Sequence, residues 1–204
     1  MTAPVRTQEA RKAESERRII KAAGELFARQ GYTGTTLADV GKRAGYTGGL
    51  VSHRFGSKEG LLKAVVQRAS NRFLSDQLEP ALDERSAESA LRSYIEVYLN
   101  EVSVRESRMR TLYVVMGEAL GAVPEIADEI ATMNRGIRRY LERIIQRGVE
   151  AGEFRSDLKP ERSAVLILGL LRGITMQYLA DRKAFDPKTL VGPVVTSALA
   201  GPKA

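Results

Sequence analysis

The residues best suited to chemistry lie between Thr47 and Lys58, and they are hydrogen-bond donors and glycines rather than a catalytic set. Gly48 and Gly49 would let the backbone come close to a large ligand, and free N–H groups at a helix start suit phosphate. Lys58 adds a positive charge at the start of the next helix, where the helix dipole attracts the same anion. The pattern favours contact with a polyanion such as nucleic acid.

Two short helices are expected to carry these residues. Thr36 opens the first helix, and Asp39 three positions later completes a capping box. Gly45 can adopt the left-handed conformation that ends this helix, and Thr47 is a good N-cap for the next one, which runs to Phe55. This layout is typical of a helix-turn-helix, in which the second helix enters the DNA major groove.

The candidate DNA contacts divide by the part of the duplex that each residue would touch. Leu50 can contact a thymine methyl group, while Ser52 and Arg54 can donate to base edges or phosphates. The other side chains are expected at phosphates, where they fix register rather than sequence. The candidate set is Arg17, Thr36, Thr47, Gly48, Gly49, Leu50, Ser52, His53, Arg54 and Lys58.

Charge supports a polyanionic partner for the same part of the chain. Residues 1–72 contain 14 Lys and Arg and six Asp and Glu, a net of +8, within a total net charge of +7. The cationic excess therefore lies entirely in the N-terminal third. A solvated basic tail is the alternative explanation, and it fits residues 6–12 better than the charges expected on helices.

Composition argues against an enzyme. The 204 residues include no cysteine and a single histidine, so no thiolate or multi-histidine metal site can form. The sequence shows no Ser-His-Asp set, glycine-rich phosphate loop or dinucleotide fingerprint. We predict no catalytic residues, no metal and no cofactor. The polar N-terminus lacks a signal peptide, and the apolar run Ala164 to Met176 contains Arg172 and is too short for a bilayer, so we expect a cytoplasmic protein without a membrane partner.

Helical periodicity continues along the whole chain and predicts an all-α fold. We expect an N-terminal three-helix DNA-binding domain over residues 1–56 and a helical ligand-binding and dimerisation domain over residues 57–204. The expected helices cover about 10–30, 36–44, 47–55, 57–77, 87–102, 107–120, 124–151, 160–179 and 187–201.

The segment from Ala164 to Met176 is apolar on nearly every side, so it should be buried on all sides. A second subunit is the simplest cover for its outer face, and an ordinary core helix of a monomer is the alternative. The candidate dimer residues are Leu166, Gly169, Leu170, Gly173, Val191 and Val195.

For an effector pocket the sequence offers aromatic and methionine residues on helices of the C-terminal body, where packed core residues are the competing interpretation. The candidates are Tyr94, Tyr98, Tyr113, Met116, Met133, Met176 and Gln177. The surrounding apolar positions are mostly aliphatic, which slightly favours an apolar or amphipathic ligand.

The stretch from about Arg17 to Val66 resembles the N-terminal domain of TetR-type transcriptional regulators. The resemblance includes the Phe27 to Gly31 end of the first helix, the Thr35-Thr36 pair and the Ser57-Lys58-Glu59 start of the fourth. Ser52-His53 is similar to the betaine-responsive repressor branch. Ser52 and Arg54 replace aromatic residues of many relatives, so no operator sequence can be transferred.

The resemblance implies a homodimer that binds a palindromic DNA operator and releases it when a small-molecule effector binds the C-terminal body. It implies repression in most cases. The alternative function is a sequence-neutral architectural DNA-binding protein.

Overall fold

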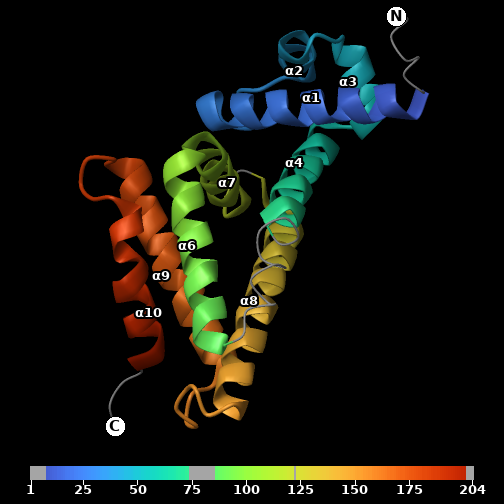
Figure 1. The fold of residues 1–204 in the computed structure, drawn as a ribbon. Coiled ribbons are helices and arrows are strands. Elements are labelled where there is room, and N and C mark those ends of the chain that lie inside the picture. Colours follow the sequence, from blue (N-terminus) through green and yellow to red (C-terminus); the bar gives the residue numbers. More distant parts are fainter. Residues whose placement is uncertain (1–7, 74–85, 122, 201–204) are drawn as a thin grey trace, which may run out of the picture. The chain divides into compact units, whose positions relative to one another are not determined.

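The computed structural model describes residues 8–73, 86–121 and 123–200, and these residues contain helices and no strand (Figure 1). The all-α expectation is confirmed. The elements are α1 (Gln8–Gln30), α2 (Leu37–Ala44), α3 (Gly48–Phe55), α4 (Lys58–Phe73), α6 (Ala87–Val104), α7 (Glu106–Ala119), α8 (Ala127–Glu150), α9 (Pro160–Ala180) and α10 (Val191–Ala200), with 3₁₀ turns at Pro124–Ile126 and Pro187–Leu190.

The helices predicted from the sequence agree with these bounds to within a few residues, except near two prolines. Pro124 and Pro187 each open a 3₁₀ turn, and the α-helix begins only after it. Proline has no N–H group to donate, which is tolerated in the first turn of a helix, and 3₁₀ geometry is common at helix starts. The expected end of the fourth helix at Gln77 lies outside the described residues.

The chain divides into two compact units. The first unit is Met1–Ala69 with Arg110–Ile130, and the second unit is Ser70–Met109 with Ala131–Ala204. The sequence placed a domain boundary between residues 56 and 57, which stays a prediction. The division into compact units lies elsewhere, because most of α4 and most of α7 fall in the first unit.

The first unit is built on α1. Helices α1 and α2 contact each other, as do α2 and α3. The apolar side of α1 supplies Ile19 and Phe27 to the core, α2 supplies Val40 and α3 supplies Val51, and all four are fully or almost fully buried.

The second unit packs α6 against α9 and α10 (Figure 1). One side of helix α6 is buried along its length, including Leu91, Ile95 and Leu99. Helix α9 is longer than the apolar run seen in the sequence, because it extends from Pro160 to Ala180. Its length and composition would allow it to cross a membrane, which corrects the expectation that it is too short; core helices of soluble proteins pass the same test.

Candidate nucleic-acid interface

Local hydrogen bonds define both helices of the predicted helix-turn-helix. The Thr36 hydroxyl accepts the Asp39 N–H at 3.1 Å, and the Asp39 carboxylate accepts the Thr36 N–H, so the capping box is confirmed. The Thr36 hydroxyl also donates to the Asp39 carboxylate at 2.6 Å, and this bond, followed by the one from the Thr36 N–H, lowers the pKa of Asp39. Gly45 has φ of +79°, the left-handed conformation expected at the end of α2. The Thr47 hydroxyl accepts the Leu50 N–H at 3.1 Å and caps α3.

Two glycines let α2 and α3 approach closely, and only one of them was noticed in the sequence. A Cβ on Gly41 would lie 2.7 Å from the backbone nitrogen of Gly48, and a Cβ on Gly48 would lie 3.0 Å from the Cα of Ala38. We interpreted Gly48 as a residue that lets the backbone approach DNA. The structure shows a different requirement for it, because Gly48 faces α2. A Cβ on Gly49 would meet only the Thr47 hydroxyl oxygen, at 3.8 Å.

The exposed surface of α3 consists of small and polar residues. Gly49, Ser52 and His53 are exposed, and Leu50 is half-buried. Val51 is fully buried and fixes the opposite side of the helix to the core. The structure therefore brings these predicted contacts together on one solvent-facing surface next to the Thr47 cap, where they could meet the groove of a duplex.

Arg54 is turned away from exposed Gly49, Ser52 and His53 and lies on the side of α3 that carries half-buried Leu50, four positions earlier. Its Nη1 is 3.7 Å from the Glu16 carboxylate of α1, and 22% of its side chain is exposed. Arg54 therefore packs α3 against α1, a role that the sequence did not reveal. Its contact with a base would require this pair to open, and it stays a prediction.

Arg17, another predicted DNA contact, also pairs with a carboxylate of α1. Its guanidinium pairs with the Glu14 carboxylate on the exposed surface of the same helix. A backbone phosphate would have to compete with this carboxylate. Because an exposed pair contributes at most about 1 kcal/mol, such an exchange is inexpensive.

The Lys58 ammonium binds the protein in this structure. Its Nζ donates to the carbonyls of Tyr32 at 3.0 Å, Thr33 at 3.4 Å and Thr35 at 3.0 Å, and it lies 4.3 Å from the centre of the Tyr32 ring. An ammonium has three donors, so all of them are used. Sequence reasoning assigned Lys58 to a phosphate. A phosphate contact would require Lys58 to give up its hydrogen bonds to these carbonyls, and it stays a prediction.

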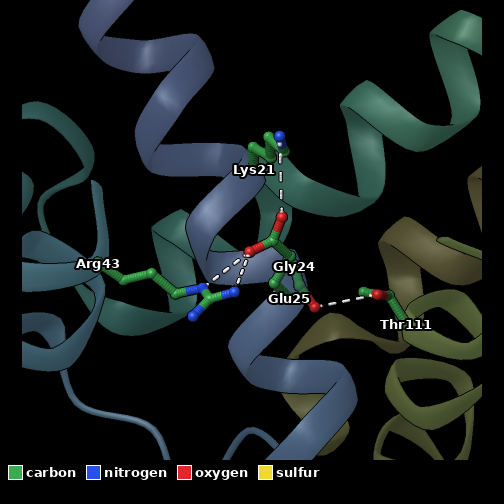
Figure 2. Close-up of polar contacts among 5 residues, drawn as sticks. All are labelled: Lys21, Gly24, Glu25, Arg43 and Thr111. Atoms are coloured by element: carbon green, nitrogen blue, oxygen red, sulfur yellow. Dashed lines mark hydrogen bonds and ion pairs between the residues drawn. The ribbon is translucent and has the colours of Figure 1, made fainter. Parts of the chain in front are cut away.

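Ion pairs also hold α2 to α1. The Glu25 carboxylate accepts from the Arg43 Nε at 2.7 Å and lies 3.9 Å from the Lys21 ammonium, as Figure 2 shows. These residues carry no local motif, and sequence reasoning missed the pairing because Glu25 and Arg43 belong to different helices. The basic surface of this unit is thus partly neutralised by carboxylates.

The predicted effector residues fall into different environments. Tyr94, Tyr98 and Met133 are buried in the second unit. The Tyr94 ring lies 5.6 Å from the Tyr140 ring, a neighbour that the sequence did not indicate. Burial raises the pKa of Tyr140 to about 12, against the opposing charges of Arg143 and Arg147.

Two further effector candidates of the second unit, Met176 and Gln177, are not buried. Met176 is 57% exposed and Gln177 is also exposed, so their assignment to an interior pocket is wrong for this structure. Both lie on the outer side of α9, because the helical spacing turns them away from buried Ile174 and Thr175. Tyr113 and Met116 are half-buried in the first unit, and their role stays a prediction.

The dimer candidates separate in the same way. Leu166 and Leu170 are exposed on α9, and Gly169 and Gly173 have open space beside them. Val195 is only 3% exposed within a single chain, so its assignment to a dimer surface is wrong; it packs inside the second unit. Val191 is half-buried. The sequence missed Val165, which extends the exposed apolar surface of α9 together with Met176.

Comparison with known proteins agrees with this architecture. The chain is 27% identical over 179 residues to the transcriptional regulator AcrR of Shigella flexneri, covering 86% of this chain and 83% of that one. The fold is similar to the fatty acid degradation regulator FadR of Bacillus halodurans, with a TM-score of 0.80 and 21% identity over 92% of this chain and 96% of that one. FadR of Bacillus subtilis in complex with stearoyl-CoA gives a TM-score of 0.79 at 21% identity, covering 92% and 99%.

Two family models match the chain. Residues 19–65 match the tetR family of bacterial regulatory proteins, and residues 87–200, more than half of the chain, match the C-terminal region of BetI-type transcriptional repressors. The first match contains the helix-turn-helix described above. The chain therefore belongs to the TetR family and is a DNA-binding transcriptional regulator with a BetI-type C-terminal region.

Proposed function

We propose that this protein is a cytoplasmic homodimeric repressor that binds a palindromic operator through α3 and is released by a small-molecule effector. One observation carries the DNA-binding part of the proposal. Gly49, Ser52 and His53 share the exposed surface of α3, while buried Val51 and the Thr47 cap hold the helix in place. A rigid helix with a small and polar exposed surface suits entry into a major groove.

A second copy of the chain is the proposed cover for the outer surface of α9. Val165, Leu166, Leu170 and Met176 expose large apolar side chains along that surface. Open space beside Gly169 and Gly173 would let another helix approach closely. Burying this surface across a two-fold axis removes apolar area from water, and a two-fold dimer also matches a palindromic operator.

The proposed effector is apolar or amphipathic. The interior of the second unit is lined by aliphatic residues around the rings of Tyr94, Tyr98 and Tyr140. The similar FadR of Bacillus subtilis was solved with stearoyl-CoA, a ligand of that class. Candidate ligands can be tested by their effect on operator affinity, because coupling of about 1–3 kcal/mol must appear reciprocally in both binding constants.

Selection of bound duplexes from a random pool tests the DNA-binding proposal. We expect enrichment of a palindrome whose half-sites are separated by about one or more helical turns. A titration with random competitor DNA then measures preference for the selected sequence. Equal competition by random and selected duplexes would instead support a sequence-neutral architectural protein.

A further inference from the structure

Charged side chains from two distant segments hold the turn between α1 and α2. The Tyr32 N–H donates to both carboxylate oxygens of Glu118 on α7, at 2.8 and 3.0 Å. From the other side, Lys58 at the start of α4 donates to the carbonyls of Tyr32, Thr33 and Thr35. The turn, residues 32–35, is thus bound at its N–H by an anion and at its carbonyls by a cation. Hydrogen bonds to charged groups are the stronger kind.

This turn leads directly into the helix-turn-helix. Thr35 is fully buried, and its hydroxyl donates to the Gly31 carbonyl at 2.8 Å. The next residue is Thr36, the N-cap of α2. Because Gly41 of α2 leaves no spare room against Gly48 of α3, a shift at the start of α2 must be passed on to α3.

Helix α7 is attached both to α1 and to the turn that follows α1. Besides the Glu118 contact, the Thr111 hydroxyl donates to the Gly24 carbonyl at 3.0 Å (Figure 2). Thr111 and Glu118 are seven positions apart, which places them on one side of α7 two turns from each other. The Glu118 carboxylate also lies against Gly31, where a Cβ would be 3.0 Å from its Oε1.

We propose that Glu118 is a positioning residue for DNA binding, which fixes the start of α2, and through α2 the recognition helix α3, by holding the Tyr32 N–H. This inference rests on the proposed function, in which α3 contacts the operator. It gives α7 a direct part in DNA affinity, although Glu118 is 86 positions from Tyr32 and carries a charge that repels DNA.

The sign of the effect separates this role from long-range electrostatics. Removing a carboxylate from a DNA-binding unit should strengthen binding, because one repulsion with the phosphates is lost. Loss of the Glu118 contact should weaken binding despite that gain. Glu125 provides the matched control: it is exposed, and it acts on the same tyrosine, since burial and then the charges of Glu59, Glu125 and Glu118 raise the pKa of Tyr32.

The experiment measures the affinity of the full chain for its selected operator at several salt concentrations. The variants are Glu118→Ala, Glu118→Gln and Glu125→Ala, with thermal unfolding and helix content recorded for each. We expect Glu118→Ala to weaken operator binding about tenfold, the loss of one charge-assisted hydrogen bond. Glu118→Gln keeps an acceptor oxygen and should recover part of the affinity, while Glu125→Ala should bind as well as the wild type or better.

The salt dependence separates this role from a phosphate contact, and a double variant tests whether Glu118 and Lys58 act through the same turn. Glu118 contacts no phosphate in this proposal, so the slope of affinity against salt should stay unchanged. Lys58→Met should weaken binding, and the part of its effect that does not depend on salt should not add to that of Glu118→Ala, because both residues hold the same turn.

Operator affinity of Glu118→Ala equal to or tighter than that of the wild type would overturn the inference. If Glu118→Ala does not fold, the operator affinity of Glu118→Gln decides the question in the same way. We expect this variant to bind the operator about twofold to threefold more weakly than the wild type, because it loses part of that hydrogen bond. A wild-type protein that prefers no duplex sequence would refute the proposed function instead, before any variant is compared.

Discussion

Helices α3 and α9 both expose a surface to solvent, but the two surfaces have opposite chemistry. The exposed residues of α3 are Gly49, Ser52 and His53, whereas α9 exposes Leu166 at 70% and further apolar side chains beside it. The first surface is stable in water and can bind and leave a polyanion. Exposure of the apolar α9 surface to water costs free energy, so this surface is suited to permanent burial against a partner.

The way each helix is held differs too. Helix α3 is only eight residues long and depends on the Thr47 cap and the close contact with α2. Helix α9 has 21 residues, no side-chain cap, and a buried side fixed by Ile167, Leu168 and Leu171. Local hydrogen bonds therefore define the DNA-binding surface, and apolar packing defines the proposed dimer surface.

The largest expected effect is at Leu166, the most exposed apolar residue of the α9 surface. Leu166→Glu would place like charges next to each other across a two-fold axis, and such a juxtaposition costs several kcal/mol. We expect the dimer dissociation constant to rise about 100-fold or more, measured by analytical ultracentrifugation.

Leu120→Glu is the matched control, since Leu120 is 91% exposed in the first unit. It should leave the dimer intact. A dimer that tolerates glutamate at residue 166 would mean that α9 is not the interface.

Neighbouring glycines sharpen the account of α3. Gly48→Ala puts a Cβ 3.0 Å from the Ala38 Cα, so it should lower the free energy of unfolding by about 1–3 kcal/mol. Gly49→Ala should stabilise the helix or leave it unchanged, because the added Cβ meets only the Thr47 hydroxyl. The Gly49→Ala variant should instead bind the operator more weakly than the wild type. Denaturant unfolding and DNA binding, measured on both variants, separate the two roles; equal destabilisation would contradict the geometry.

A smaller effect is expected at the base-contacting positions. Ser52→Ala removes one donor from the exposed surface, so it should weaken operator binding by about 1 kcal/mol and relax the selected sequence at one position.

Arg54→Ala removes the pair with Glu16 and should lower stability while leaving the selected sequence unchanged. A changed sequence preference in Arg54→Ala would show that this pair opens on DNA.

The smallest effect concerns the capping box. Hydrogen bonds from Thr36 lower the pKa of Asp39, so the stabilisation is complete above the unfolded-state pKa of about 3.9 and is lost as pH falls through the lower folded-state value. Wild-type stability should therefore decline below about pH 4 more steeply than that of Asp39→Asn. Urea unfolding at a series of pH values measures this difference, and parallel curves would mean that the box does not contribute.

The success of sequence reasoning follows the range of the interactions. Thr36, Gly45 and Thr47 act on neighbours a few positions away, so the caps and the helix bounds were predicted correctly. The all-α fold followed from periodicity. The candidate site was predicted less completely, because the residues that engage Lys58 and Arg54 come from other elements.

Long-range contacts account for the remaining differences. Nothing near Glu118 in the sequence indicates that its carboxylate meets Tyr32. Met176 and Val195 were assigned by residue type, and only the packed fold decides which side of an apolar helix is buried. Gly41 was overlooked because a glycine inside a helix gives no signal of the neighbour that it accommodates.

Competition between two duplexes tests the central claim, that α3 reads a symmetric sequence from a dimer. The first duplex carries the selected palindrome, and the second has one half-site scrambled, both at near-physiological salt. The account predicts that scrambling one half-site weakens binding by about 100-fold or more, since each mismatched base pair costs about 1–3 kcal/mol. Equal affinity for the two duplexes would contradict it.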